Sequence, residues 1–202
     1  MKTIHFFSPK GGTGTTTTAS IFALALSEQG KTIITDKSGH SPNVGAYLSV
    51  GIYEPSRLYQ VNPNLNACTG GIYYGGEHPY GDDTDFMVYD WGTKHPGRDF
   101  AVEHGEEVIM VVRNDYFCMK ACIDEKLDKN DYVLVLNPDG VLTQNDIAQV
   151  MRREPVAVSH LDPKVARAND AGLLSTRYNN LEALMGLNDH AGVVASKSEA
   201  LA

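Results

Sequence analysis

The sequence predicts a single doubly wound α/β domain, in which helices flank a mostly parallel sheet. Three observations predict it. Strand-like and helix-like segments alternate along most of the 202 residues, the strand-like segments are continuous apolar runs, and a glycine-rich loop joins the first strand to the first helix. Continuous apolar runs suit parallel strands that helices cover on both faces. The length suits one domain with a substantial core.

The first 36 residues predict the βαβ unit of such a sheet. Residues 2–7 (KTIHFF) form a short apolar strand. Residues 16–30 (TTTASIFALALSEQG) have helical spacing, and Gly30 is placed to end the helix. Residues 31–36 (KTIITD) form a second strand that ends in Asp36. Strand, loop, helix and strand in this order make up a parallel unit.

The rest of the chain continues this alternation after a looser segment. Glycine, proline, asparagine and tyrosine are frequent in residues 37–84, which predicts loops and short elements over one end of the sheet. Apolar runs then predict four more strands, at residues 85–92, 106–112, 131–138 and 155–163. Helical spacing predicts helices at residues 115–128, 142–154, 164–174 and 176–187.

The last residues lack such a pattern. Residues 188–202 are small and polar without a strong period, so we expect one domain over residues 1–187 and a flexible tail over 188–202.

Composition and charge narrow the class of protein. A hydrophobic share of 42% and a charged share of 21% are ordinary for a globular protein. The formal charge of −8 argues against binding nucleic acid through bulk electrostatics but leaves a local basic patch open. No apolar run approaches ~20 residues, and the N-terminus lacks the features of a signal peptide. We therefore expect a cytoplasmic protein.

The cysteines predict buried, reduced thiols. The chain has three cysteines, an odd number, at Cys68, Cys118 and Cys122. The last two are four residues apart, which would place them on one face of a helix. Two thiols alone make a poor metal site.

Residues 8–20 (SPKGGTGTTTTAS) carry the clearest functional signal. Gly11, Gly12 and Gly14 allow the backbone to curl around an anion. The N-terminus of the following helix adds partial positive charge, and the Thr16 hydroxyl is placed to hold Mg²⁺. The other interpretation is a glycine turn that packs a helix close to a strand. The loop alone does not decide between the two.

Together with later motifs, the loop resembles the deviant Walker A ATPases, the ParA and MinD class of partition and positioning proteins. The family's loop runs Lys, Gly, Gly, x, Gly, Lys, Ser/Thr, Thr, and this sequence reads KGGTGTTT. Thr15 departs from the pattern, since it stands where the family has its second lysine. The matching positions are Lys10, Gly11, Gly12, Gly14, Thr16 and Thr17.

The resemblance implies a nucleotide site in this loop. It implies that residues 10–17, Thr13 and Thr15 included, bind ATP or ADP with Mg²⁺, and that Lys10 crosses a dimer interface to the partner's nucleotide. Lys10 is therefore also the expected catalytic residue.

Later segments extend the resemblance to about residue 175. DFMVYDWG is similar to the family's Walker B strand, which implies that Asp90 holds Mg²⁺ together with Thr16 and Asp36. VLVLNP resembles the strand whose last asparagine, here Asn137, reads the adenine edge. In PVAVSHLDPKVARANDAGLL, the resemblance places Leu161 and Asp162 beside the adenine.

Two departures fall on the chemistry of hydrolysis. Thr15 replaces the cationic lysine, and Ser38 stands where the family has the acid that positions the attacking water. Phosphoryl transfer depends mainly on positioning and on neutralising charge, so we expect turnover to suffer more than binding. Lys10, Lys37 or Lys94 could replace the missing cation; the other interpretation of Lys37 and Lys94, which we favour, is that they are solvated loop charges. We interpret His40 and His95, near the same edge of the sheet, as surface residues.

A basic group in the C-terminal third has two interpretations. It is either a non-specific DNA surface, as in the partition branch of the family, or a solvated helix face with interspersed acids. The group comprises Arg152, Arg153, Lys164 and Arg167, with Arg177 beyond them. The last residues hold a single lysine and little amphipathic character, which argues against the membrane helix of the positioning branch.

We therefore favour a ParA-like nucleotide-binding protein that partitions or positions plasmid DNA, phage DNA or another cargo. It would act as a homodimer with an unidentified adaptor or cargo protein, with weak or absent ATP hydrolysis. One alternative is a catalytically degenerate localisation scaffold, similar to the pilus-assembly branch of the family. A small-molecule ligase or kinase is the least favoured, because such enzymes need the full phosphoryl-transfer machinery.

Overall fold

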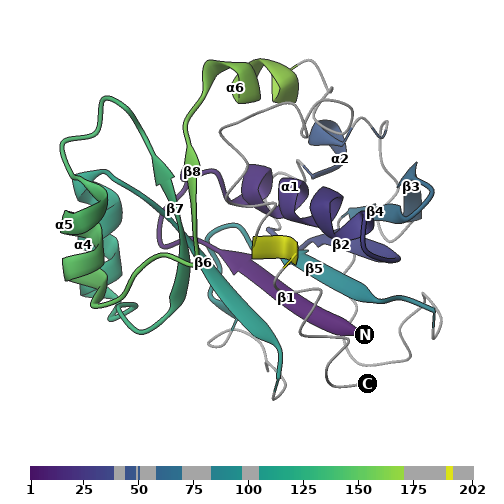
Figure 1. The fold of residues 1–202 in the computed structure, drawn as a ribbon, viewed down its shortest axis with the longest axis horizontal. Coiled ribbons are helices and arrows are strands. Elements are labelled where there is room, and N and C mark those ends of the chain that lie inside the picture. Colours follow the sequence, from purple (N-terminus) through teal and green to yellow (C-terminus); the bar gives the residue numbers. More distant parts are fainter. Residues whose placement is uncertain are drawn as a thin grey trace.

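The computed structural model describes residues 1–38, 44–48, 50, 58–69, 83–96, 105–170 and 190–192. Eight of their strands form one sheet in the order β3-β4-β2-β5-β1-β6-β7-β8 (Figure 1). All neighbouring strands are parallel except the pair β3 and β4. The predicted fold class, a mostly parallel sheet flanked by helices, is confirmed. The elements are β1 Lys2–Phe7, α1 Thr15–Ser27, β2 Thr32–Asp36, α2 Val44–Tyr47, β3 Leu58–Asn62, β4 Leu65–Thr69, β5 Phe86–Asp90, β6 Glu107–Arg113, α4 Tyr116–Asp124, β7 Asp131–Leu136, α5 Gln144–Met151, β8 Ala157–His160 and α6 Pro163–Asp170.

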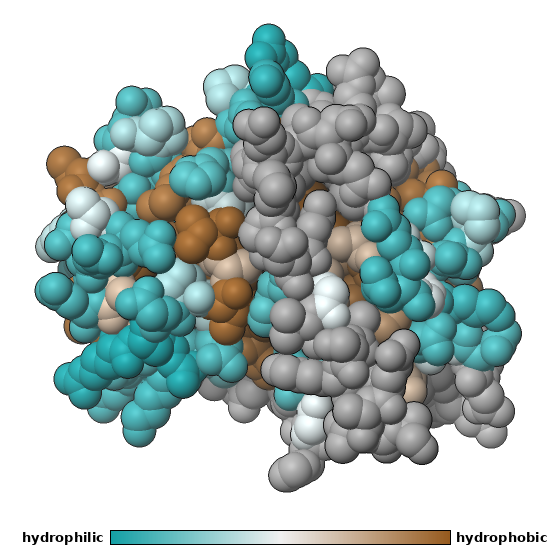
Figure 2. Space-filling view, viewed as in Figure 1, coloured by the Kyte–Doolittle hydropathy of each residue, from teal (hydrophilic) through white to brown (hydrophobic). Residues whose placement is uncertain are grey.

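The central strands are buried on both faces, as the continuous apolar runs predict. Successive side chains of a strand point to opposite faces, and β1 accordingly sends Phe6 into one core cluster and Phe7 into the other. The first cluster contains residues of α1, α2 and α6, and the second contains residues of α4 and α5. Figure 1 shows α1 and α4 on opposite sides of the sheet. Hydrophilic residues dominate the outer surface of the α4 and α5 layer, at the left of Figure 2.

The strand order creates a switch point at the end of β1. The chain leaves β1 through α1 towards β2, and later continues from β6 through α4 towards β7 on the other side. The helices that follow β1 and β6 therefore cover opposite faces. In open α/β sheets, ligands bind outside the carboxyl ends of the strands at such a point. The glycine-rich loop lies at this end.

Within the described residues, the predicted elements agree with the observed ones apart from their ends. Residues 2–7 are a strand as predicted, whereas α1 ends at Ser27 and a turn leads to Gly30. Within residues 37–84, where we expected loops and short elements, the structure forms α2 and the hairpin of β3 and β4. The hairpin turns at residues 62–65, where the Asn64 amide donates to Asn62 Oδ1 at 2.8 Å.

The C-terminal predictions lie mostly outside the described residues. This applies to residues 171–174, to the predicted helix 176–187 and to most of 188–202. Residues 190–192 are helical, and Ala191 is buried. The His190 ring lies 5.8 Å from that of Phe22, between ring centres. This part of the expected tail therefore packs against the core.

Two further predictions concern composition. Cys68, Cys118 and Cys122 are free and buried, as expected. In the part of the chain that the structure describes, no helix has both the length and the apolar character needed to cross a membrane.

Candidate functional site

The loop between β1 and α1 has a backbone that only glycine adopts easily. Gly12 and Gly14 have φ angles of 79° and 98°, in the left-handed region. A Cβ atom added at Gly11, Gly12 or Gly14 would have no other group within 4 Å. Conformation, rather than crowding, therefore requires glycine at positions 12 and 14, and the backbone is accessible along this stretch.

The same loop leaves the N-terminus of α1 without a side-chain cap. Gly14 occupies the cap position, and the first helical hydrogen bond runs from the Thr18 amide to the Gly14 carbonyl at 2.9 Å. The amides of the first turn have no partner within a helix, and they carry the positive end of the helix dipole. The loop is thus curled, and an anion site at this helix N-terminus stays a prediction.

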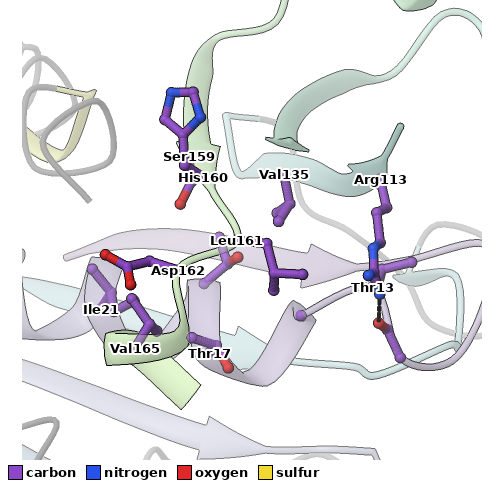
Figure 3. A pocket seen from close by; sticks show the side chains of 13 residues that line it. Thr13, Thr17, Ile21, Arg113, Val135, Ser159, His160, Leu161, Asp162 and Val165 are labelled. Atoms are coloured by element: carbon purple, nitrogen blue, oxygen red, sulfur yellow. Dashed lines mark hydrogen bonds between the residues drawn. The ribbon is translucent and has the colours of Figure 1, made fainter. Parts of the chain in front are cut away.

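A pocket lies beside this loop (Figure 3). The loop and the first turns of α1 form one wall, and the turn between β8 and α6 forms the other. Leu161 and Asp162 come from that turn, so the structure places them opposite the loop. Apolar residues such as Ile21 and Val165 line the pocket together with hydroxyl and carboxyl groups. Such a lining suits a ligand with an apolar ring and an anionic part.

Two carboxylates meet at the ends of adjacent strands next to the loop. Asp36 of β2 and Asp90 of β5 are register partners, with exposed fractions of 2% and 0%. Burial raises the pKa of Asp90 to about 6; hydrogen bonds from Thr16 and the Gly92 amide lower it, and the charge of Asp36 raises it. The site therefore holds negative charge in a dry environment.

Thr16 and Asp90 fit a Mg²⁺ ion. Asp90 Oδ1 accepts from the Gly92 amide at 2.9 Å, whereas Oδ2 is buried and has no hydrogen-bond partner among the described residues. A buried polar atom without a partner needs an explanation, and hydroxyl and carboxylate oxygens are ligands that Mg²⁺ prefers. A bound Mg²⁺ would satisfy this oxygen.

Asp36 has a different role in this structure. Its Oδ1 accepts from the amide and the hydroxyl of Ser38, at 3.0 and 2.6 Å, and its Oδ2 accepts from the Val44 amide at 3.3 Å. Asp36 therefore holds the start of α2, and its contribution to a metal site is its charge. The described residues contain no group of three or more histidine, cysteine, aspartate or glutamate side chains suited to a metal.

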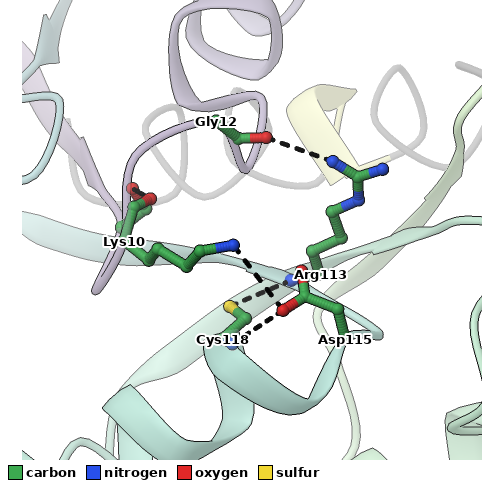
Figure 4. A network of polar contacts seen from close by, with 6 residues as sticks. Lys10, Gly12, Arg113, Asp115 and Cys118 are labelled. Carbon is green, nitrogen blue, oxygen red and sulfur yellow. Dashed lines mark hydrogen bonds and ion pairs between the residues drawn. The ribbon is translucent and has the colours of Figure 1, made fainter.

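Position 15 holds a neutral threonine, and the ammonium group of Lys10 lies outside the pocket lining. Thr15 is 6% exposed, and its hydroxyl oxygen lies 3.2 Å from that of Thr13, so the side chain turns into the loop. Lys10 points the other way, towards α4 (Figure 4). Its Nζ lies 3.7 Å from Asp115 Oδ1 and 6.0 Å from the centre of the Phe117 ring.

The other candidate cations also lie outside the pocket lining. Lys37 Nζ lies over the Tyr89 ring at 5.8 Å, and burial lowers the pKa of this lysine. Lys94 Nζ donates to the Lys37 carbonyl at 3.3 Å. The His95 ring packs on Phe7, with 4.6 Å between ring centres, and His40 lies outside the described residues.

Asn137 follows β7 and is not part of the pocket lining. Its amide donates to Asn114 Oδ1 at 2.6 Å, and its carbonyl accepts from Asn114 Nδ2 at 3.1 Å. Its own side chain accepts from the Asp139 amide at 3.2 Å and so closes a turn. The role of Asn137 at an adenine edge stays a prediction.

Arg113 is a pocket residue that our sequence analysis missed. It is the last residue of β6, and its Nη1 donates to the Gly12 carbonyl at 3.3 Å (Figure 3). The predicted strand ends at residue 112, one residue before it. The available signal was its position, because Arg113 ends an apolar strand in the same way as Asp90.

The predicted basic group is divided between the two faces of the sheet. Arg152 and Arg153 follow α5, whereas Lys164 and Arg167 belong to α6 on the opposite face. Arg153 Nη1 pairs with Asp131 Oδ1 at 2.5 Å. A DNA surface formed by these four residues stays a prediction, and the structure does not bring them together.

Comparisons with known proteins match the fold. Neither a protein-family model nor a curated protein sequence matches the chain. Solved structures do match. A ParA family ATPase from Chlorobium tepidum superposes with a TM-score of 0.77 at 18% identity, over 94% of this chain and 97% of that chain. A chain of the MinC:MinD cell division complex from Aquifex aeolicus gives 0.76 at 18% identity, over 97% and 96%.

A third similar structure is described by its name as a nucleotide complex. The septum site-determining protein MinD from Pyrococcus horikoshii, in complex with Mg-ADP, gives a TM-score of 0.69 at 20% identity, over 96% of this chain and 95% of that chain. Similarity at this identity identifies a fold. The protein has the fold of the MinD and ParA P-loop ATPases.

Proposed function

We propose that the protein binds ATP or ADP with Mg²⁺ at the β1–α1 loop and acts as a ParA-like partition or positioning protein. The observation that carries the proposal is the curled, accessible loop of Gly12 and Gly14, which opens onto a pocket closed by Leu161 and Asp162. The Mg-ADP complex of the similar MinD structure supports the choice of ligand.

Different groups of the chain bind the phosphates, the metal ion and the base. Amides of the loop and of the first turn of α1 bind the phosphates. Thr16 and Asp90 hold Mg²⁺, which neutralises phosphate charge when bound. Leu161 and Asp162 enclose the base against α1.

Weak or absent hydrolysis follows from two positions. The Thr15 hydroxyl faces Thr13 inside the loop, and the Ser38 hydroxyl donates to Asp36. Neither side chain brings charge to the γ-phosphate or a base to the attacking water, which are the main contributions to phosphoryl transfer.

A nucleotide-dependent homodimer is compatible with the position of Lys10. Its ion pair with Asp115 joins side chains that are 43% and 30% exposed, and such pairs contribute about 0–1 kcal/mol. Lys10 can therefore leave Asp115 at small cost and reach a partner's nucleotide. Cargo is contacted through an adaptor protein or, in the DNA hypothesis, through basic residues that follow α5 and lie in α6, namely Arg152, Arg153, Lys164 and Arg167.

The test is a titration of Mg²⁺-ATP into the wild type and a Thr15→Lys variant, with affinity, dimerisation and hydrolysis measured together. We expect the wild type to bind and dimerise with very slow turnover, and the variant to hydrolyse faster. Absence of wild-type binding at millimolar nucleotide would overturn the proposal. A wild-type monomer at saturating nucleotide would overturn its dimer part.

The buried Thr15 hydroxyl also favours a second candidate, a localisation scaffold that binds nucleotide without turnover. Robust ATP hydrolysis that disappears in Asp90→Ala would exclude the scaffold. A ligase or kinase needs the charge that Thr15 lacks, and remains the least favoured.

A further inference from the structure

Arg113 places a cationic group over the glycine-rich loop (Figure 4). Its Nη1 contacts the Gly12 carbonyl at 3.3 Å, and the residue lines the pocket together with Gly14 and Thr17. Its Nε is buried and has no hydrogen-bond partner among the described residues. A buried donor without a partner needs an explanation, and a bound anion would supply one.

The backbone of Arg113 is fixed from several sides. Its amide donates to Cys118 Sγ at 3.4 Å, and its carbonyl accepts from the Asp115 amide at 2.8 Å. The neighbouring Asn114 donates through Nδ2 to the carbonyls of Asn137 and Leu142, at 3.1 and 3.0 Å. The end of β6 is thus anchored to α4 and to the residues after β7, and the guanidinium projects from a rigid base.

The charged groups around Arg113 are compatible with a bound anion. Asp115, two residues along, pairs with Lys10, and the carboxylate that shares the pocket is Asp162, in the opposite wall. Among the described residues, no carboxylate forms an ion pair with Arg113. The loop itself is neutral at Thr15. The pocket therefore has a cation that no carboxylate of the described residues neutralises through an ion pair.

We propose that Arg113 supplies, within one chain, the cationic contact to a nucleotide phosphate that Thr15 cannot supply. This inference rests on the proposed nucleotide binding. Guanidinium groups bind phosphate oxygens in a planar, two-pronged geometry, and a phosphate oxygen is a stronger acceptor than the Gly12 carbonyl. On binding, the guanidinium exchanges that carbonyl for the phosphate.

The test compares Mg²⁺-ATP with adenosine, which has the base and ribose but no phosphate, by calorimetric titration. Arg113→Gln should weaken ATP binding roughly 10- to 100-fold, since a charged hydrogen bond is lost, and leave adenosine binding unchanged. Lys120→Gln is the matched control, because Lys120 is exposed on α4 and pairs with Asp124. It changes the net charge equally and should leave the affinity for both ligands unchanged.

A rescue experiment separates a phosphate contact from a structural role. Thr15→Lys added to Arg113→Gln should restore ATP affinity, because a lysine in the loop returns the missing charge. Equal ATP affinity in wild type and Arg113→Gln would overturn the inference and leave nucleotide binding intact. Parallel losses for ATP and adenosine would also overturn it. A wild type that binds neither ligand would instead overturn the proposed function.

Discussion

Asp90 is the residue whose surroundings most clearly favour a bound cation. It is fully buried, lies beside Asp36, and leaves one carboxylate oxygen without a hydrogen bond in the described structure. Its pKa of about 6 means that at neutral pH the fold holds an ionised group that burial disfavours. Burial of this negative charge lowers the free energy of unfolding, and a bound metal ion would offset that loss.

This predicts a pH dependence that Asp90→Asn should remove. Between the ordinary pKa of 3.8 and about 6, the folded state binds more protons than the unfolded state, so the free energy of unfolding falls as pH rises through this range. The full effect is ~3 kcal/mol. We expect the metal-free variant to gain stability relative to wild type by up to this amount from pH 4 to pH 7.

Chemical denaturation of both proteins across this pH range measures the effect. Groups that do not interact with Asp90 contribute equally to both profiles, so the difference between the profiles reports the titration of Asp90 together with its coupling to Asp36. A difference that stays constant from pH 4 to pH 7 would contradict the assignment.

At the scale of elements, the carboxyl ends of β6 and β7 are joined by one side chain. Asn114 is 3% exposed and exchanges three hydrogen bonds with the residues that follow β7. Gly140 packs directly against it, since a Cβ at that position would lie 2.3 Å from Asn114 Nδ2. The small size of Gly140 therefore keeps the two strand ends together.

Gly140→Ala should consequently destabilise the protein. The added methyl group must displace Asn114 and leave buried polar groups unpaired, at a cost of about 1–3 kcal/mol. Gly192→Ala is the matched control, because a Cβ there meets nothing within 4 Å. Urea unfolding of both variants decides the matter, and equal stability of the two would show that the Asn114 contacts are dispensable.

Some secondary-structure elements could be predicted from the sequence and others could not. The central strands and α1 could be located because each is a long apolar or periodic run between glycines and acids. The hairpin of β3 and β4 could not, since the side chains of β3 are mostly half-buried and β4 mixes its buried residues with the polar Asn66. Arg113 was missed because its role depends on pairing between β1 and β6, which brings it over a loop 101 residues away.

At the scale of the whole molecule, ligand binding should stabilise the fold. A ligand at 100 times its Kd adds about 2.7 kcal/mol to the free energy of unfolding, which corresponds to roughly 5–10 °C in Tm for a chain of this size. We expect ADP with Mg²⁺ to produce this shift in a thermal denaturation series. ADP with EDTA is the control and should produce a smaller shift, whereas equal shifts would argue against a metal at Thr16 and Asp90.

The central position of β1 has a consequence for how the protein opens. β1 has a hydrogen-bonded neighbour on each side, whereas β3 has one neighbour and an irregular register. Amide protons of β1 should therefore exchange with solvent deuterium only when the entire sheet separates, and those of β3 during local fraying. Because the glycine-rich loop continues directly from β1, its base would keep its shape while the outer strands loosen.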